Sequence, residues 1–281
     1  MHLKRAILFM VLSTIAFTGM NGLLKYLTQY SGYQLVFFRS LGSLFFTFGF
    51  LISKGIPILG TNRKLLLLRG VLGSTSMLLF FIAVHYMPIG SAVALRYIAP
   101  IFAAVFAILF LREKVRPIQW IFFVVAFVGV LVLKGFDDAI SPIGLILVLS
   151  ASVLSGLVYI VIRKIGLSEH PVVIVNYFMC IATIVGGIGA IFTWVTPKAT
   201  DFVLLFSLGI FGYYGQIFMT KAFQMGETNV IAPIKYVEVV FAIIVGVGFL
   251  GETYSVWSFV GIALIISGLL LNLWYKGKYA S

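Results

Sequence analysis

The sequence predicts an all-α membrane protein with ten transmembrane helices arranged as two inverted five-helix repeats. Three observations predict this fold: the composition, a series of ten apolar stretches, and an internal repeat at a constant offset. Of the 281 residues, 62% are hydrophobic and 10% are charged, with a mean hydropathy of +1.14. Charged residues make up about 25% of a typical soluble domain. Lipid is therefore the main environment of the chain.

The apolar residues occur in continuous blocks, such as residues 101–111, 120–133 and 237–250. Within a bilayer every backbone polar group is satisfied internally, so a spanning segment is either a helix or a strand of a closed barrel. A barrel strand alternates apolar and polar residues. These blocks do not alternate, and they predict helices.

Each predicted helix is an apolar stretch close to the 20 or so residues that cross a bilayer core. Short loops separate the stretches, so no soluble domain is expected. The predicted helices cover residues 6–24, 33–53, 66–85, 90–111, 117–134, 142–162, 172–194, 202–220, 229–250 and 255–274.

The distribution of Lys and Arg predicts the orientation. Three loop cations, Lys25, Lys134 and Lys198, fall on one side. Fourteen fall on the other side: Lys4, Arg5, Lys54, Arg63, Lys64, Arg69, Arg112, Lys114, Arg116, Arg163, Lys164, Lys221, Lys276 and Lys278. Loops rich in Lys and Arg stay in the cytoplasm. We expect a multi-pass protein of the cell inner (plasma) membrane with both termini cytoplasmic.

An internal repeat appears when the chain is shifted by 139 residues. Among the aligned pairs are Gly70 with Gly209, Gly73 with Gly212, Arg96 with Lys235, Tyr97 with Tyr236, Phe102 with Phe241, Glu113 with Glu252 and Gly129 with Gly268. We expect one repeat over residues 1–136 and a second over residues 137–281. Five helices is an odd number, so the second repeat enters the membrane upside down, an arrangement that recurs in secondary transporters.

The chain resembles the EamA family of the drug/metabolite transporter superfamily in several motifs. These are Arg39 after Phe37 and Phe38, the stretch from Ala92 to Pro100, the run Leu250, Gly251 and Glu252, and the series Trp257, Gly261 and Gly268. The resemblance covers essentially the whole chain in two copies and implies export or exchange of amino acids, cofactors or other metabolites. The first copy departs from the pattern, with Arg112 in place of Gly251 and Phe122 in place of Gly261.

Four ionisable residues are predicted inside helices, where charge is costly and usually functional: Arg39, Arg96, Lys235 and Glu238. Lys235 and Glu238 are three residues apart and therefore share a helical face. One interpretation is a structural ion pair within that helix. The other is a substrate site in which the three cations receive a carboxylate or phosphate and Glu238 sets selectivity or exchanges a proton. Arg96 is also placed to reach Glu238 across the two halves as a gate.

Further polar side chains on apolar spans are expected to line the same cavity: Tyr97, Tyr236, Tyr214, Gln216, Asn176, Tyr177 and Tyr159. An interfacial or packing role is the alternative for each tyrosine. The bands Gly70, Gly73, Ser76 and Gly209, Gly212, Gly215 are expected to allow close helix packing. Glu113 and Glu252 are expected to stabilise the positive ends of the helices that follow them.

The sequence thus predicts a secondary transporter of a small polar metabolite, anionic or zwitterionic, such as an organic acid, an amino acid or a nucleotide-like cofactor. A flippase of lipid-linked substrates on the same fold is an alternative, and an intramembrane enzyme is a weaker one, because no catalytic constellation is visible. We expect no cofactor, no metal and no nucleic-acid partner; the expected partners are the substrate and the bilayer. A coupling proton, a counter-substrate and the oligomeric state are left open.

Overall fold

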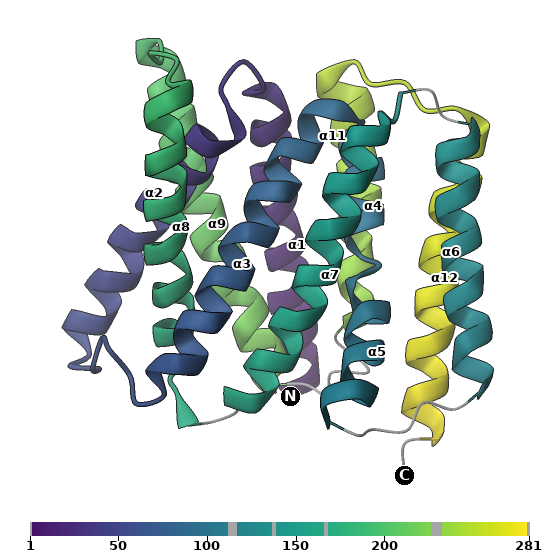
Figure 1. Ribbon diagram of the computed structural model, residues 1–281, viewed down its shortest axis with the longest axis horizontal. Coiled ribbons are helices and arrows are strands. Elements are labelled where there is room, and N and C mark those ends of the chain that lie inside the picture. The colour runs from purple at the N-terminus through teal and green to yellow at the C-terminus, as the bar shows by residue number, and fades with distance from the viewer. Residues whose placement is uncertain (1, 112–116, 137–138, 166–167, 226–231, 280–281) are drawn as a thin grey trace.

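The computed structural model describes residues 2–111, 117–136, 139–165, 168–225 and 232–279, and its regular elements in these ranges are helices (Figure 1). The first half contains α1 His2–Tyr26, α2 Gly32–Ser53, α3 Arg63–Ala83, the 3-10 helix η1 Val84–Tyr86, α4 Ile89–Arg96, α5 Ala99–Leu111 and α6 Pro117–Phe136. The second half contains α7 Pro142–Ile165, α8 Pro171–Thr193, α9 Ala199–Met225, the 3-10 helix η3 Ala232–Tyr236, α11 Val237–Leu250 and α12 Val256–Tyr279.

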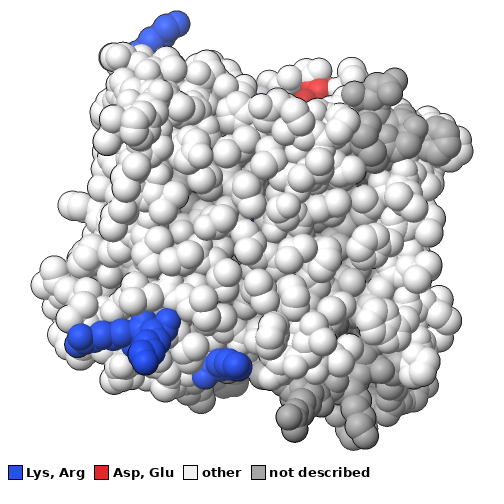
Figure 2. Space-filling model, viewed as in Figure 1, with Lys and Arg blue, Asp and Glu red and all other residues white. Residues whose placement is uncertain are grey.

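Each of the ten predicted spans corresponds to a helix or to a pair of consecutive helices. Seven stretches are long and apolar enough to cross a membrane, and shorter apolar segments lie in α6 and α12. The fourth span comprises α4 and α5, and the ninth comprises η3 and α11. On the face shown in Figure 2, Lys, Arg, Asp and Glu lie at two opposite edges with an uncharged band between them. The predicted fold class is confirmed.

The repeat extends to the bounds of the elements. Shifting α2, Gly32–Ser53, by 139 residues gives 171–192, and α8 covers Pro171–Thr193. In space α2 packs against its repeat counterpart α8, and α6 packs against α12. α1 begins at the end of the molecule where both termini lie, whereas α7 ends there (Figure 1). The two halves therefore run in opposite senses, as predicted.

Local signals explain where several helices begin. Ser31 and Asn62 cap α2 and α3 with side-chain oxygens that accept from backbone N–H groups three residues later. Prolines occupy the first position of α6, α7 and α8, where the missing N–H costs no helical hydrogen bond.

Small residues bring helices of the two halves into close contact. A Cβ atom on Gly209 of α9 would lie 2.6 Å from the Cα of Gly42 in α2, and Ser43 Oγ donates to Gly209 O over 2.9 Å. Ser13 Oγ of α1 donates to a carbonyl of α9 over 2.8 Å, and Ser76 Oγ of α3 donates to a carbonyl of α7 over 2.7 Å. These contacts show the packing expected of the glycine bands.

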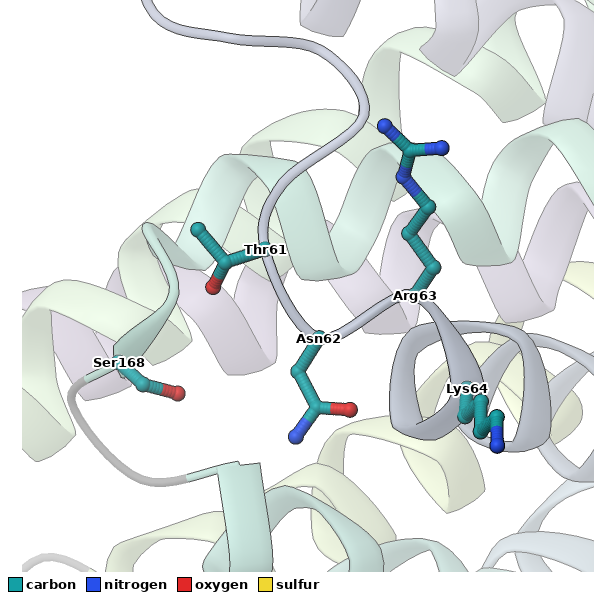
Figure 3. A pocket seen from close by; sticks show the side chains of 5 residues that line it. All are labelled: Thr61, Asn62, Arg63, Lys64 and Ser168. Atoms are coloured by element: carbon teal, nitrogen blue, oxygen red, sulfur yellow. The ribbon is translucent and has the colours of Figure 1, made fainter.

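One buried carboxylate joins the two halves outside the spans. Glu169, between α7 and α8, accepts hydrogen bonds from Thr61 N (2.6 Å), Thr61 Oγ1 (2.7 Å) and Asn62 N (2.5 Å) at the start of α3. Beside it, Thr61, Asn62, Arg63, Lys64 and Ser168 line a hollow of about 490 Å³ (Figure 3). Burial raises the pKa of Glu169, but its hydrogen bonds outweigh burial, and the pKa lies below its usual value.

We predict that Glu169→Gln lowers the free energy of unfolding by about 1.5–3 kcal/mol at pH 7, the usual range for hydrogen bonds to a charged group. Because the folded pKa is depressed, this stabilisation is present above the unfolded pKa and is lost as the pH falls through the folded value. The measurement is thermal unfolding in detergent from pH 7 to about pH 3, which spans the unfolded pKa and the region below it. The difference between wild type and variant should shrink towards the acidic end; a difference independent of pH would contradict the assignment.

Candidate functional site

Two helix breaks occur at repeat-equivalent positions near the centre of the bundle. α4 ends at Arg96 and α5 begins at Ala99, and the second break lies where η3 passes into α11 at Tyr236. Pro100 explains the first break, since it has no backbone N–H to donate to the carbonyl of Arg96, four residues earlier. Tyr97 and Tyr236, which are related by the offset of 139, pack at the breaks with ring centroids 5.4 Å apart and planes at 77°.

Glu238 lies beside these tyrosines in the first turn of α11 and is 5% exposed. Its carboxylate accepts from Tyr97 Oη over 2.6 Å and from Asn21 Nδ2 of α1 over 3.0 Å. The positive end of α11 also favours a negative charge at this position. Asn21 Oδ1 is buried without a hydrogen-bond partner. The breaks thus present a carboxylate and a free carbonyl oxygen in one place.

Two cations flank this carboxylate without forming an ion pair with it. Lys235 Nζ donates to Met219 Sδ over 3.3 Å and lies 5.5 Å from the centroid of the Tyr97 ring. Arg96 Cζ lies 4.3 Å from the centroid of the Phe80 ring. Among the described residues, the one ion pair closer than 4.0 Å joins Lys25 and Glu252. The structural pair of Lys235 and Glu238 is therefore not formed here.

A second group of cations lies between α2, α3 and α8. Arg39 is 2% exposed and Arg69 is 6% exposed, and their Cζ atoms lie 5.5 Å and 4.2 Å from the centroid of the Phe178 ring. Arg39 Nη1 donates to Met179 Sδ over 3.4 Å. Arg39 Nε and both Nε and Nη1 of Arg69 have no hydrogen-bond partner. Arg69, counted above with the cations of the cytoplasmic side and inside the predicted helix 66–85, is a buried residue of α3, so it is a further cation inside a helix beside the three predicted there.

The contacts of these two arginines do not offset the cost of their burial. Removing a guanidinium from water costs several kcal/mol even after relaxation. A cation–π contact returns about 0.5–2 kcal/mol. In the described part of the chain no carboxylate lies within 4.0 Å of either side chain. Arg39 and Arg69 therefore carry uncompensated charge.

The structure brings several predicted site residues to the helix breaks and leaves others away from them. Arg96, Tyr97, Lys235, Tyr236 and Glu238 lie at the breaks. Tyr159 of α7 is 43% exposed. It lies close enough to Tyr97 and Tyr236 to interact electrostatically with both. Gln216 is half-buried in α9.

Three predicted residues have other roles. Asn176 Oδ1 accepts from Thr47 Oγ1 over 2.8 Å and ties α8 to α2. Tyr177 Oη donates to Leu59 O over 2.8 Å and fastens the loop between α2 and α3. Tyr214 is 45% exposed and stacks on Phe218 at 5.8 Å on the outside of α9. The expectation that these three line the central cavity is not supported, because their side chains are committed elsewhere.

Lys25 and Glu252 close the end of the bundle opposite the termini. Their charged groups are 3.7 Å apart, and Lys25 Nζ also donates to Val84 O and Met87 O, each over 2.9 Å. Glu252 accepts from Ile89 N over 3.0 Å at the start of α4. Glu252 was expected to stabilise the helix that follows it, α12; it stabilises the positive end of α4 instead. The repeat relates this pair to Lys164 and Glu113, and Glu113 lies outside the described residues.

The described residues contain no group of three or more His, Cys, Asp and Glu side chains arranged to hold a metal ion.

The sequence model of the EamA-like transporter family matches residues 4–134 and again residues 142–274. A solved protein crystal structure superposes with a TM-score of 0.72, covering 98% of each chain at 14% identity, which shows a shared fold.

Curated relatives with similarity over most of this chain are membrane transporters by name. The pseudopaline exporter CntI of Pseudomonas aeruginosa is 29% identical over 96% of this chain and 93% of its own. The S-adenosylmethionine uptake transporter of Rickettsia conorii is 27% identical over 95% of this chain and 92% of its own. Human solute carrier family 35 member G1 is 28% identical over 82% of this chain and 67% of its own.

Proposed function

The chain belongs to the EamA-like transporter family, and on that premise we propose that it is a secondary transporter, not an enzyme, that carries a small zwitterionic metabolite by alternating access. The observation that carries this proposal is the buried Glu238 at a pair of repeat-related helix breaks. Broken helices at the interface of inverted repeats are the usual site of substrate binding in secondary transporters.

The acceptor groups at the breaks suit the ammonium end of a substrate. The Glu238 carboxylate and the unpartnered Asn21 Oδ1 supply oxygens for N–H donors. The rings of Tyr97 and Tyr236 supply π faces that attract a cation. An ammonium that replaces the two neutral donors on Glu238 adds the attraction of opposite charges to the hydrogen bond, and such bonds between ionised groups are among the stronger ones in proteins.

The cations at the breaks suit the acidic end of the substrate. Arg96 and Lys235 are related by the repeat and approach Glu238 from opposite halves. Their present partners are aromatic rings and a thioether, which an oxyanion displaces at little cost. The N-terminus of α5 adds a positive helix end at the same level of the bundle. An amino acid or a derivative of one has both kinds of group.

Alternating access requires that one end of the site closes while the other opens. We propose that the protein lies in the inner membrane with both termini in the cytoplasm. The ion pair of Lys25 and Glu252 then closes the periplasmic end of the site. Leu24 and Leu27, close to Lys25 in the chain, and Ile89, whose N–H donates to Glu252, are fully buried. With this end closed, we propose that the half-buried Arg96, Tyr97 and Lys235 are reached from the cytoplasmic end.

The relatives described above support the proposal that this chain transports a small molecule. Their names include both an exporter and an uptake transporter. The substrates of those proteins differ from one another. The side chains at the helix breaks of this chain therefore define its substrate class better than the family does.

We predict that Glu238→Gln, Arg96→Ala and Lys235→Ala each reduce transport at least tenfold while the protein still folds. The assay is uptake of radiolabelled amino acids, organic acids and nucleotide-like cofactors into proteoliposomes, followed by the variants on the compounds that wild type carries. Tyr214→Phe is the matched control, because Tyr214 faces outward, and it should transport like wild type. Unchanged transport by the three variants would refute this site.

We predict that Lys25→Ala opens the periplasmic end, because the change leaves the carboxylate of Glu252 buried without its cation. The reporter is Met87→Cys in a Cys180→Ala background, labelled in intact cells with a membrane-impermeant thiol reagent. The labelling rate should rise about tenfold in Lys25→Ala and stay at the wild-type level in Lys198→Ala, an exposed cation at the same end. Equal rates in the two variants would show that the ion pair does not hold this end closed.

A further inference from the structure

Arg39 and Arg69 have no role in the central site described above, yet they are the most deeply buried cations of the described chain. We propose that they form an oxyanion-binding subsite, which receives a carboxylate or phosphate group of the transported molecule. This inference rests on the proposed function and narrows the substrate class to zwitterions with an additional acidic group.

The unpartnered donors carry the inference. A guanidinium has five N–H groups in a fixed fork that matches the oxygens of a carboxylate or phosphate. Three of the nitrogens here, Arg39 Nε and Arg69 Nε and Nη1, are buried and unpaired. Both guanidinium groups lie against the same ring, Phe178, and Arg69 acts electrostatically on Arg39, so the two side chains are neighbours and are proposed to share one small anion.

The backbone leaves space for both guanidinium groups. A Cβ atom on Gly73 would lie 2.8 Å from Arg69 Nη1, and a Cβ atom on Gly212 would lie 3.1 Å from Arg39 Nε. Gly73 and Gly212 are equivalent positions in the two repeats. Each glycine therefore makes room for one of the arginines.

The fold itself does not require these charges. The second repeat has Phe178 at the position of Arg39 and Leu208 at the position of Arg69. The same helix positions are thus filled by apolar side chains in the other half. A pair of charges that the architecture does not need, and that costs free energy when empty, is best explained by a ligand.

Arg96 links the oxyanion subsite to the central site electrostatically. The charge of Arg96 acts on Arg39 and also on Glu238. Arg96 is therefore near both the oxyanion subsite and the carboxylate at the helix breaks. One extended molecule can place its amine at Glu238 and its acidic group at Arg39 and Arg69.

The test measures thermal unfolding of the purified full chain in detergent, in a low-salt buffer whose only small anion is chloride. Arg39→Met and Arg69→Met remove the charges and keep apolar bulk. Arg63→Met, an exposed position at the start of the same helix α3, is the control. Citrate and inorganic phosphate are titrated separately, so that a carboxylate site and a phosphate site are distinguished.

We expect both Met variants to be at least as stable as wild type without added anion, because each loses an uncompensated buried charge. Citrate or phosphate should raise the melting temperature of wild type and of Arg63→Met, with an apparent Kd at least tenfold weaker in the Met variants. Where a Met variant does not fold, Arg39→Lys and Arg69→Lys keep the charge without the fork and should show the same weakening.

The inference is overturned when neither anion stabilises wild type, or when the arginine variants respond like Arg63→Met. Glu238→Gln separates this result from the proposed function: it should lose transport and keep the anion response. Loss of transport in Glu238→Gln with an unchanged anion response in the arginine variants would reject the subsite alone. An anion response without transport by wild type would reject the transport proposal alone.

Discussion

The interior of this bundle depends on satisfying backbone groups where helices break inside lipid. At the end of α4 the carbonyl of Leu95 accepts from Ile98 N over 3.2 Å, whereas Pro100 has no N–H for the carbonyl of Arg96. Ser152 Oγ of α7 lies 3.1 Å from the first carbonyl oxygen and 3.4 Å from the second. Such breaks are tolerated only where protein surrounds them. The other half must therefore cover each break, and this requirement brings Tyr97, Tyr236 and Glu238 together at the interface of the two repeats.

Residues shared by the two repeats form the packing contacts of the bundle, whereas residues that differ between the repeats form the candidate site. The offset relates the helix pair α1 and α9 to the pair α7 and α3, and a serine joins each pair: Ser13 of α1 donates to α9 and Ser76 of α3 donates to α7. The chemical groups are asymmetric: Asn21 corresponds to Ile160, Glu238 to Ala99 and Arg39 to Phe178. A polar residue that the repeat replaces with an apolar one is not needed for packing. This comparison separates functional side chains from structural ones in a single sequence.

The sequence predicted the helices well because ten apolar stretches and one constant offset determine them. The side-chain partners were harder to predict. Lys235 and Glu238 were expected to share a helical face, but η3 ends between them and the change of helical geometry turns Lys235 towards Met219. Tyr214 was placed in the cavity because apolarity alone does not tell which face of a helix meets lipid. Arg69 was counted only as a cation of the cytoplasmic side because it follows Arg63 and Lys64 along the chain, although the glycine four residues later, Gly73, leaves the space for it.

The charges explain why an empty site and a filled site differ in stability. The described helices bury or half-bury four cations, Arg39, Arg69, Arg96 and Lys235, but one carboxylate near them, Glu238, so the protein without ligand holds excess positive charge in a medium that solvates it poorly. An anionic or zwitterionic ligand with more than one acidic group relieves this imbalance at the moment it binds. Closing the bundle around these cations costs less free energy once the ligand supplies the missing negative charge. Under the proposed function, the imbalance that destabilises the bundle without ligand favours movement of the form with ligand bound, as alternating access requires.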